Sequence, residues 1–511
     1  MIQSQLPILI IAIPLFMALA ISIFGRKNDT LCFYLLVLGM AGTFAAALGA
    51  LNQVLATGEK IHYYLGGWPA PHGIELVIDH LSSMVLCMVS GVALLVGLYS
   101  KRTVPAEVPF RTEQERVPQR VPNYYTLYCL LISGLLAMTA TGDAFNLYVS
   151  LEIAALASYG LLALGRGRSY FATFKYLIMG TIGASFYLLG VGYLYAKTGS
   201  LNMADLHGIL DLLSMHQSTS ITIAFAMIMV GIWVKMAFFP LHGWLPNAYT
   251  LASNTSSCLI APLMTKVSVY MMVRLMFSVF SANYVFVTLG WQNLVVPMAA
   301  VAIVFGSISA LGQKNLKRML TYIVIAEVGY MVGGAWLGNA NGYIGAVYHI
   351  LADGMMTLCV FMALGAVTYK TGDSSLESMR GIFRKMPITA TVFVVGAFAM
   401  IGIPPTCGFF SKWYLVTGAY EAGQWFFLGA LLFSSLINAI IFFRIIETGF
   451  FPDFSKEKKS GHHDVKVLVA EAPLSMLLPM VITAFSLLLI GLYSKDIING
   501  LIRPSIPPGL F

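Results

Sequence analysis

Long apolar stretches follow one another along almost the whole chain, separated by short polar segments. Each is about 20 residues long, the length that an α-helix needs to cross the apolar core of a bilayer. The pattern predicts an all-α polytopic membrane protein, with about 14 transmembrane helices in a single membrane domain of residues 1–511. The predicted spans are residues 4–24, 31–53, 76–99, 123–141, 145–164, 174–196, 219–239, 255–277, 285–310, 318–337, 342–369, 387–420, 425–446 and 472–494.

Two segments are too long for one straight crossing and contain helix-breaking residues. Residues 219–252 contain FPLHG, and residues 387–420 contain GIPP. Proline removes a backbone donor, and in a membrane the freed carbonyls need protein or water partners. Interrupted helices at corresponding positions favour two inverted five-helix repeats, about residues 123–277 and 285–446, with broken helices 7 and 12. In the alternative interpretation, the prolines only shape helix packing.

Composition and charge exclude a soluble protein. The 511 residues are 58% hydrophobic and only 10% charged, and the net charge is +8. The positive charge indicates topology rather than nucleic-acid binding, because it is sorted into alternate loops. By the positive-inside rule these loops are cytoplasmic, so both termini face outward from the cell membrane. The sorted residues are Arg26, Lys27, Lys101, Arg102, Arg111, Arg116, Arg120, Arg166, Arg168, Lys314, Lys317, Arg318, Lys370, Arg380, Arg384, Lys385, Lys456, Lys458, Lys459 and Lys466.

Ionisable residues inside the apolar stretches are the main candidates for function. Glu152, Lys175, Lys235, Lys266 and Lys412 all lie there. A charge at the bilayer centre costs at least about 2.5–3.5 kcal/mol on insertion scales, so we expect the set to move an ion; structural ion pairs are the alternative. A carboxylate stabilises a nearby lysine ammonium, so a change in their distance loads or releases a proton. Glu152 with Lys235 is the first predicted pair, and Lys266 and Lys412 continue the proton path.

Further candidates are less specific. His349 fits a proton relay or a hydrogen-bonded core residue, and His242 fits a relay or a cap on the broken helix. Lys175 is also expected to reach the cytoplasmic surface. Asp79 and Glu75 show no evident partner within the chain, and runs such as LLFSSLINAIIFF are apolar enough to face lipid. These features predict a protein that works only inside a complex.

Five segments together resemble the antiporter-like subunits of the complex I/Mrp superfamily. The resemblance is strongest to the D subunit of the Mrp-type Na⁺/H⁺ antiporter and extends to the related subunit of membrane-bound energy-converting hydrogenases. It implies fourteen helices, inverted repeats and a hydrated polar axis along the membrane plane. By motif position, it assigns proton transfer to Glu152, Lys235, Lys266 and Lys412. The segments are GDAFNLYVSLEIAALASYGLLALG, WVKMAFFPLHGWLPNAY, LMTKVSVYMMVRL, QKNLKRMLTYIVIAEVGY and GIPPTCGFFSKW.

The chain departs from this family at several positions. Where the family often has HxxxHxxxK, the chain has His349, Asp353 and Thr357. Glu327 stands where the family more often has another polar residue, and it occupies the second helix of the second repeat as Glu152 does in the first. Asp353 and Glu327 are therefore candidate relay residues.

The predicted function is that of a proton-translocating subunit in a multisubunit monovalent cation (Na⁺)/H⁺ antiporter. The alternative is a proton-pumping subunit of a complex I-like NADH:quinone oxidoreductase or a membrane-bound hydrogenase. The chain is not expected to be catalytic alone. Its expected partners are other membrane subunits, H⁺, Na⁺ and lipid, without nucleic acid. The scattered cysteines predict neither a metal site nor a bound cofactor.

Overall fold

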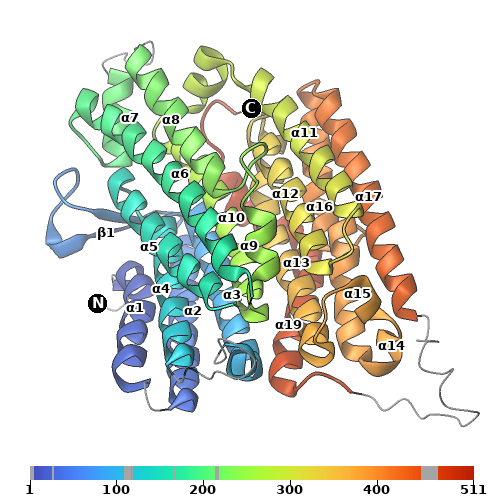
Figure 1. Ribbon diagram of the computed structural model, residues 1–511. Coiled ribbons are helices and arrows are strands. Elements are labelled where there is room, and N and C mark those ends of the chain that lie inside the picture. The colour runs from blue at the N-terminus through green and yellow to red at the C-terminus, as the bar shows by residue number, and fades with distance from the viewer. Residues whose placement is uncertain are drawn as a thin grey trace, which may run out of the picture.

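Helices form almost all of the structure, a computed structural model that describes residues 5–25, 28–108, 117, 119–165, 167–212, 218–450 and 470–510 (Figure 1). Part of the predicted charge pattern lies outside the described residues. This part comprises Arg26, Lys27, Arg111, Arg116, Arg166, Lys456, Lys458, Lys459 and Lys466.

Eleven of the described helices are long and apolar enough to cross a membrane. Among them, α10 and α13 form the centre of the bundle, since 94% of the most apolar 18-residue stretch of each helix is buried inside the protein. The eleven are α1 (Leu6–Phe24), α2 (Asp29–Thr57), α3 (His80–Glu107), α4 (Arg120–Ala140), α5 (Ala144–Ala163), α6 (Ser169–Thr198), α10 (Asn254–Ser278), α11 (Gln292–Leu311), α13 (Ala340–Thr371), α17 (Trp425–Phe450) and α19 (Leu474–Leu492).

Helix α12 (Leu316–Ala335) and two broken helices bring the described crossings to the predicted fourteen. The first broken helix consists of α8 (Thr219–Lys235) and α9 (Leu245–Leu251), and the second of α15 (Pro387–Ile401) and α16 (Cys407–Glu421). The predicted proline segments form both breaks. The prediction of a polytopic helical bundle with broken helices 7 and 12 is confirmed.

The helices from α4 to α10 and those from α11 to α17 are arranged alike. In each set the first crossing packs against the second, as α4 does on α5 and α11 on α12. The third packs against the broken fourth, as α6 does on α8 and α13 on α15 and α16. The fifth helix of the first set, α10, packs against the third helix of the second set, α13. Side chains from both sets therefore meet at the α10–α13 contact.

The predicted span 76–99 begins too early, because residues 76–78 belong to a β-hairpin and not to the helix. Strands β1 (Ile61–Tyr64) and β2 (Glu75–Ile78) pair antiparallel, with Ile61 opposite Ile78. The helix begins only after Asp79, whose side chain accepts a hydrogen bond from the Ser82 backbone N–H. The four-residue strand and the helix that follows it are both apolar, so the sequence shows them as one continuous apolar stretch. The strand was therefore predicted as part of the helix.

Several short helical segments complete the described structure. The predicted span 285–310 is divided, because η5 precedes α11. The segments are α7 (Met203–Leu212), α14 (Ile382–Lys385), α20 (Ser494–Ile497), η3 (Leu65–Gly67), η5 (Tyr284–Leu289), η6 (Leu376–Met379), η7 (Ile498–Ile502) and η8 (Arg503–Ser505).

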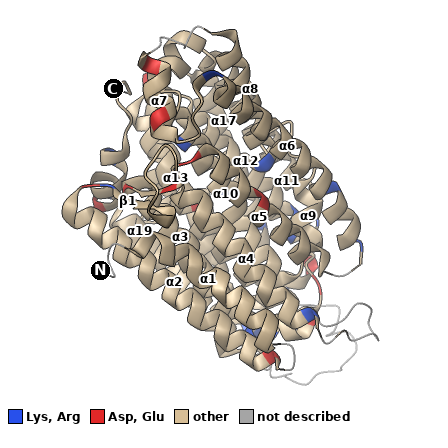
Figure 2. Ribbon diagram, turned by 90° about the vertical axis from the view of Figure 1, so that its left-hand side faces the viewer, with Lys and Arg blue, Asp and Glu red and all other residues tan. Residues whose placement is uncertain are grey.

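Both ends of the described chain lie on the face of the bundle that carries the hairpin. Helix α1 packs against β1 and β2, and the C-terminal segment reaches the start of α13, where the Tyr343 hydroxyl donates to the Ser505 carbonyl over 3.0 Å. Figure 2 shows charged residues mainly toward the ends of the bundle, with a few at the middle of its height. A chain that crosses the bundle an even number of times ends on the face where it began, so both ends lie on the same face.

Candidate functional site

Glu152 and Lys235 form the predicted ion pair. The Lys235 Nζ lies 3.2 Å from the Glu152 Oε1, between α8 and α5. The lysine side chain is 3% exposed and the glutamate side chain 25% exposed. Lys235 is the last residue of α8, so its backbone lies at the helix break.

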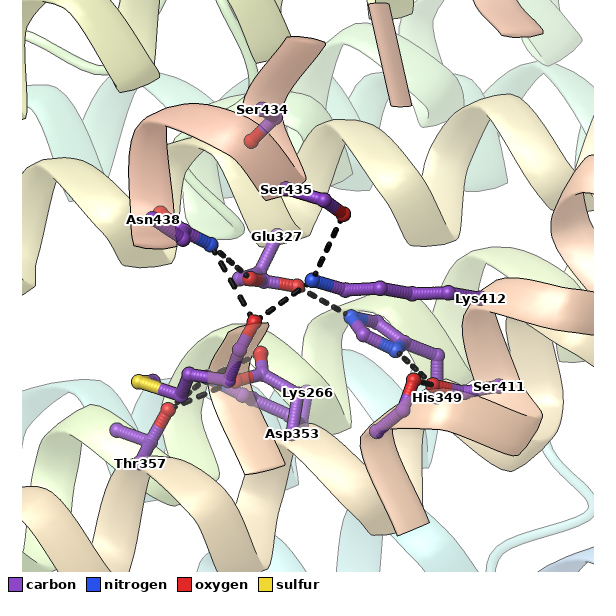
Figure 3. Close-up of polar contacts among 12 residues, drawn as sticks. Lys266, Glu327, His349, Asp353, Thr357, Ser411, Lys412, Ser434, Ser435 and Asn438 are labelled. Carbon is purple, nitrogen blue, oxygen red and sulfur yellow. Dashed lines mark hydrogen bonds and ion pairs between the residues drawn. The ribbon is translucent and has the colours of Figure 1, made fainter. Parts of the chain in front are cut away.

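Lys266 forms a second pair with Asp353 at the α10–α13 contact. The Lys266 Nζ lies 2.8 Å from the Asp353 Oδ2, and neither side chain has exposed surface. Thr357 donates to the Asp353 Oδ1 over 2.8 Å, and the Lys266 ammonium also donates to the Ala261 carbonyl over 3.3 Å. The two residues of α13 that depart from the family pattern are therefore the ones that surround Lys266 (Figure 3).

A third couple joins Glu327 of α12 to His349 of α13. The Glu327 Oε2 and the His349 Nε2 are 2.6 Å apart, and both side chains are fully buried. The other ring nitrogen, Nδ1, lies 2.9 Å from the Ser411 hydroxyl of α16. Asn438 of α17 donates to the Glu327 Oε1 over 3.5 Å, so four helices contribute to this cluster.

Lys412 reaches back across the second break. Its ammonium donates to the carbonyls of Met400 over 2.7 Å and Ile401 over 3.3 Å, and to the Ser435 hydroxyl over 3.3 Å. The carbonyl end of a helix favours a cation, and here these are the last carbonyls of α15. Figure 3 shows Lys412, Glu327 and His349 pointing toward one another.

The two lysines of the broken helices therefore occupy equivalent places. Lys235 precedes its break in the sequence and Lys412 follows its break, which makes the repeat look imperfect. In space, the Lys412 ammonium lies at the C-terminal end of α15, because its long side chain spans the break, and Lys235 is itself the C-terminal residue of α8.

Two predicted relay residues lie apart from these clusters. The His242 ring stacks on Phe239 with 5.3 Å between centroids and contacts Phe305 at 4.9 Å, so its described neighbours are aromatic rings. Lys175 is exposed on α6, with its Nζ 4.7 Å from the Phe171 ring centroid. The structure thus joins the other predicted residues in close pairs or helix-end contacts and leaves these two at the periphery.

The run LLFSSLINAIIFF does not simply face lipid as predicted. Ser434 and Asn438 are buried on the inner face of α17, whereas Leu432 and Leu436 are exposed on the outer face. The polar residues recur four apart, which places them on one side of a helix. That spacing was the available signal for Asn438 as a contributor to the site.

The prediction that Asp79 and Glu75 lack partners within the chain is wrong. Asp79 forms an ion pair with Arg274 of α10. The Glu75 Oε1 lies 2.6 Å from the His62 Nδ1, and its Oε2 accepts from Asn202 over 3.0 Å. Arg274 is more than one hundred residues from Asp79 in the sequence, and Asn202 is more than one hundred residues from Glu75. Proximity in the sequence therefore gave no sign of these contacts.

Comparison with known proteins decides the family. The family described as NADH:quinone oxidoreductase/Mrp antiporter, TM matches residues 141–438, more than half of the chain. The chain belongs to this family. The match begins just before α5 and ends at Asn438, so it covers Glu152, Lys235, Lys266, Glu327, His349, Asp353 and Lys412.

Members of the family resemble the chain over nearly its whole length. NADH-quinone oxidoreductase subunit N of Desulforudis audaxviator (strain MP104C) is 41% identical, covering 99% of each chain. The D subunit of the Na(+)/H(+) antiporter of Bacillus subtilis (strain 168) is 31% identical, covering 94% of this chain and 93% of the relative.

Solved structures show the same fold. A chain of the membrane-bound sulfane sulfur reductase, an archaeal respiratory membrane complex, superimposes with a TM-score of 0.87 at 29% identity and covers 99% of this chain and 100% of its own length. A chain of the Mrp complex from Dietzia sp. DQ12-45-1b gives a TM-score of 0.85 at 22% identity, covering 99% and 98%. The family and the fold together establish a multi-pass membrane protein.

Proposed function

We propose that the chain is a proton-translocating membrane subunit of a multisubunit complex, with monovalent cation (Na⁺)/H⁺ antiport as the first candidate reaction. The observation that carries the proposal is the series of buried acid–base couples through the bundle. It runs from Glu152–Lys235 to Lys266–Asp353 and then to the cluster of Glu327 and His349. Ionisable groups in apolar surroundings are costly, and each of these is matched to a titratable partner.

Each couple acts as a switch whose state depends on distance. A lysine beside a carboxylate keeps its proton, and separation from the carboxylate favours release. When Lys235 moves from Glu152, its proton becomes available to the next group inward. Lys266 is held by Asp353 in the same way, so a proton arriving there is retained until that pair opens.

His349 and Lys412 extend the path toward α16 and α17. The histidine contacts Glu327 through one ring nitrogen and Ser411 through the other, the arrangement that a proton relay requires. Lys412 ends the path, because its ammonium is stabilised by helix-end carbonyls rather than by a close carboxylate ion pair. We assign the proton-transfer role to Glu152, Lys235, Lys266, His349, Asp353, Glu327 and Lys412.

A redox-driven proton pump is the second candidate. The relative called NADH-quinone oxidoreductase subunit N, at 41% identity over the full length, specifically favours it. In both candidates this chain carries protons, and partner subunits supply the driving force. We assign the two repeats of this proton-carrying unit to about residues 123–277 and 285–446.

The proposed location is the cell membrane with both termini outward. The hairpin face carries both ends of the described chain. Basic residues such as Lys314, Lys370 and Arg384 lie at the other ends of the helices, which the positive-inside rule assigns to the cytoplasm.

Purification of the intact complex tests the proposal and separates the two candidates. Co-purifying flavin or iron–sulfur proteins would indicate a redox complex, whereas only small membrane proteins would indicate an antiporter. In proteoliposomes, we expect the complex to move protons and a Lys235→Met complex to lose that movement. Robust cation/proton exchange by the chain alone, or unchanged transport after Lys235→Met, contradicts the proposal.

A further inference from the structure

One buried hydroxyl beside the first ion pair has no role in the proposed proton path. The Tyr159 side chain of α5 is 5% exposed, and its hydroxyl has no hydrogen-bond partner among the residues that the structure describes. Buried hydroxyl groups usually have a partner, because an unpaired one loses its hydrogen bonds to water without replacement. An unpaired hydroxyl inside the bundle therefore needs an explanation.

The Tyr159 hydroxyl and the Lys235 ammonium border the same point on α6. A Cβ atom added to Gly180 would overlap the Tyr159 hydroxyl oxygen and would lie 3.6 Å from the Lys235 Nζ. Only a residue without a side chain leaves this space to the two groups. Glu152, whose Oε1 lies 3.2 Å from the Lys235 Nζ, is on the same side of α5 as Tyr159, about two turns away. The ammonium therefore has Tyr159 as a second polar neighbour beside its carboxylate partner.

Aromatic packing holds the Tyr159 ring in this position. The ring packs edge-on against Tyr176 with 4.6 Å between centroids, and Tyr176 stacks on Trp244 at 4.0 Å. The Trp244 Nε1 donates to the carbonyl of Val234, the residue before Lys235, over 3.0 Å. These contacts explain an aromatic ring at this position, but a phenylalanine would make them equally well. They leave the hydroxyl without an explanation.

We propose that Tyr159 is a positioning residue for Lys235, whose ammonium its hydroxyl receives when the lysine leaves Glu152. The proposal rests on the proposed function, because it takes the Glu152–Lys235 pair to be a switch. It supplies the second position of that switch. The hydroxyl is unpaired while Lys235 contacts the carboxylate, and it gains its partner when the pair opens.

A tyrosine hydroxyl suits both protonation states of the lysine. Its oxygen accepts a hydrogen bond from the ammonium, and its O–H donates to the neutral amine that remains after Lys235 gives its proton to the next group inward. The lysine keeps its proton during the movement, so charge is conserved until that transfer. Without the hydroxyl, the ammonium would leave the carboxylate for apolar surroundings, which is costly. The hydroxyl thus lowers the free energy of the open pair.

The test uses the intact complex in proteoliposomes. Tyr159→Phe keeps the ring and removes the hydroxyl, so we expect normal assembly and proton transport slower by about tenfold or more. The matched control is Tyr187→Phe, which removes another buried hydroxyl, one that donates to the Ala144 carbonyl over 2.9 Å. We expect the control to transport within about twofold of the unmodified complex. Equal transport by the two phenylalanine variants overturns the proposal.

Gly180→Ala tests the same contact from α6. The added methyl group displaces the Tyr159 hydroxyl without removing it, so we expect a similar decrease in transport. In the double variant with Tyr159→Phe, the methyl group no longer meets a hydroxyl oxygen. A purely structural role predicts that the double variant recovers transport relative to Gly180→Ala, and such recovery contradicts the proposal. We expect the double variant to remain about as slow as each single variant, because both changes remove the same contact.

The comparison of the two phenylalanine variants decides the outcome if Gly180→Ala does not assemble. A Glu152→Gln complex measured alongside separates the two possible failures. If it is blocked while Tyr159→Phe transports normally, only the role of Tyr159 is wrong. If it also transports normally, the proposed function is wrong.

Discussion

Replacing Asp353 with asparagine probes the most deeply buried ion pair. The substitution keeps the shape of the side chain, and its amide oxygen can still accept from Thr357. It removes the negative charge 2.8 Å from the Lys266 ammonium, where neither side chain has exposed surface. Lys266 then keeps only neutral partners, the Ala261 carbonyl and the Thr357 hydroxyl.

The expected cost follows from this burial. Removing one partner of a buried ion pair typically destabilises a protein by about 3–5 kcal/mol, because the other charge is left uncompensated. Removing both charges with Lys266→Met in the same chain should recover most of that loss, since buried pairs are often replaceable by neutral residues at about zero net cost. The double variant should therefore be more stable than Asp353→Asn alone.

Two measurements on purified complexes check this prediction. Unfolding in detergent gives the change in the free energy of unfolding, and proteoliposomes give proton transport. We expect the double variant to be stable and inactive, because stability needs matched charges whereas transport needs a titratable lysine. A cost below about 1 kcal/mol for Asp353→Asn, as for an exposed pair, would refute the ion pair. Normal transport by the double variant would remove the pair from the proton path.

Three further substitutions address the remaining groups. Lys412→Gln keeps a donor for the carbonyls at the end of α15 but cannot carry a proton, so we expect intact assembly and at least about tenfold slower transport; normal transport would make Lys412 a structural cap. Glu327→Gln should slow transport by about tenfold by weakening the contact with His349, and an unchanged rate in proteoliposomes would exclude Glu327 from the relay. His242→Phe should keep transport within about twofold, because the ring only stacks on aromatic neighbours, and a large loss would restore His242 as a relay.

The number of crossings and both helix breaks were predictable from the sequence. Apolar length alone indicates a span, and proline inside residues 219–252 and 387–420 indicates a break. The start of α3 was not predictable in this way, because strand β2 and the helix after Asp79 are both apolar. Periodicity cannot separate a short buried strand from the first turn of a helix.

The residues of the site could be predicted where a charged residue interrupts an apolar stretch. Glu152 and Lys235 are charges in apolar runs, and their pairing was predicted. Asp353 appeared in the sequence as a loss of the family pattern, yet it provides the counter-charge for Lys266. That contact depends on how α10 packs on α13, which no local pattern encodes. The equivalence of Lys412 and Lys235 likewise depends on how far a lysine side chain reaches across the break.

The central claim is that the carboxylate of Glu152 controls the proton on Lys235. The most direct measurement is proton transport by the complex carrying Glu152→Gln, compared with the unmodified complex at matched expression and assembly. The substitution preserves the size of the side chain and removes its charge 3.2 Å from the ammonium. We predict that coupled transport stops while the complex still assembles. Transport at the unmodified rate would show that the pair is structural and would contradict the account.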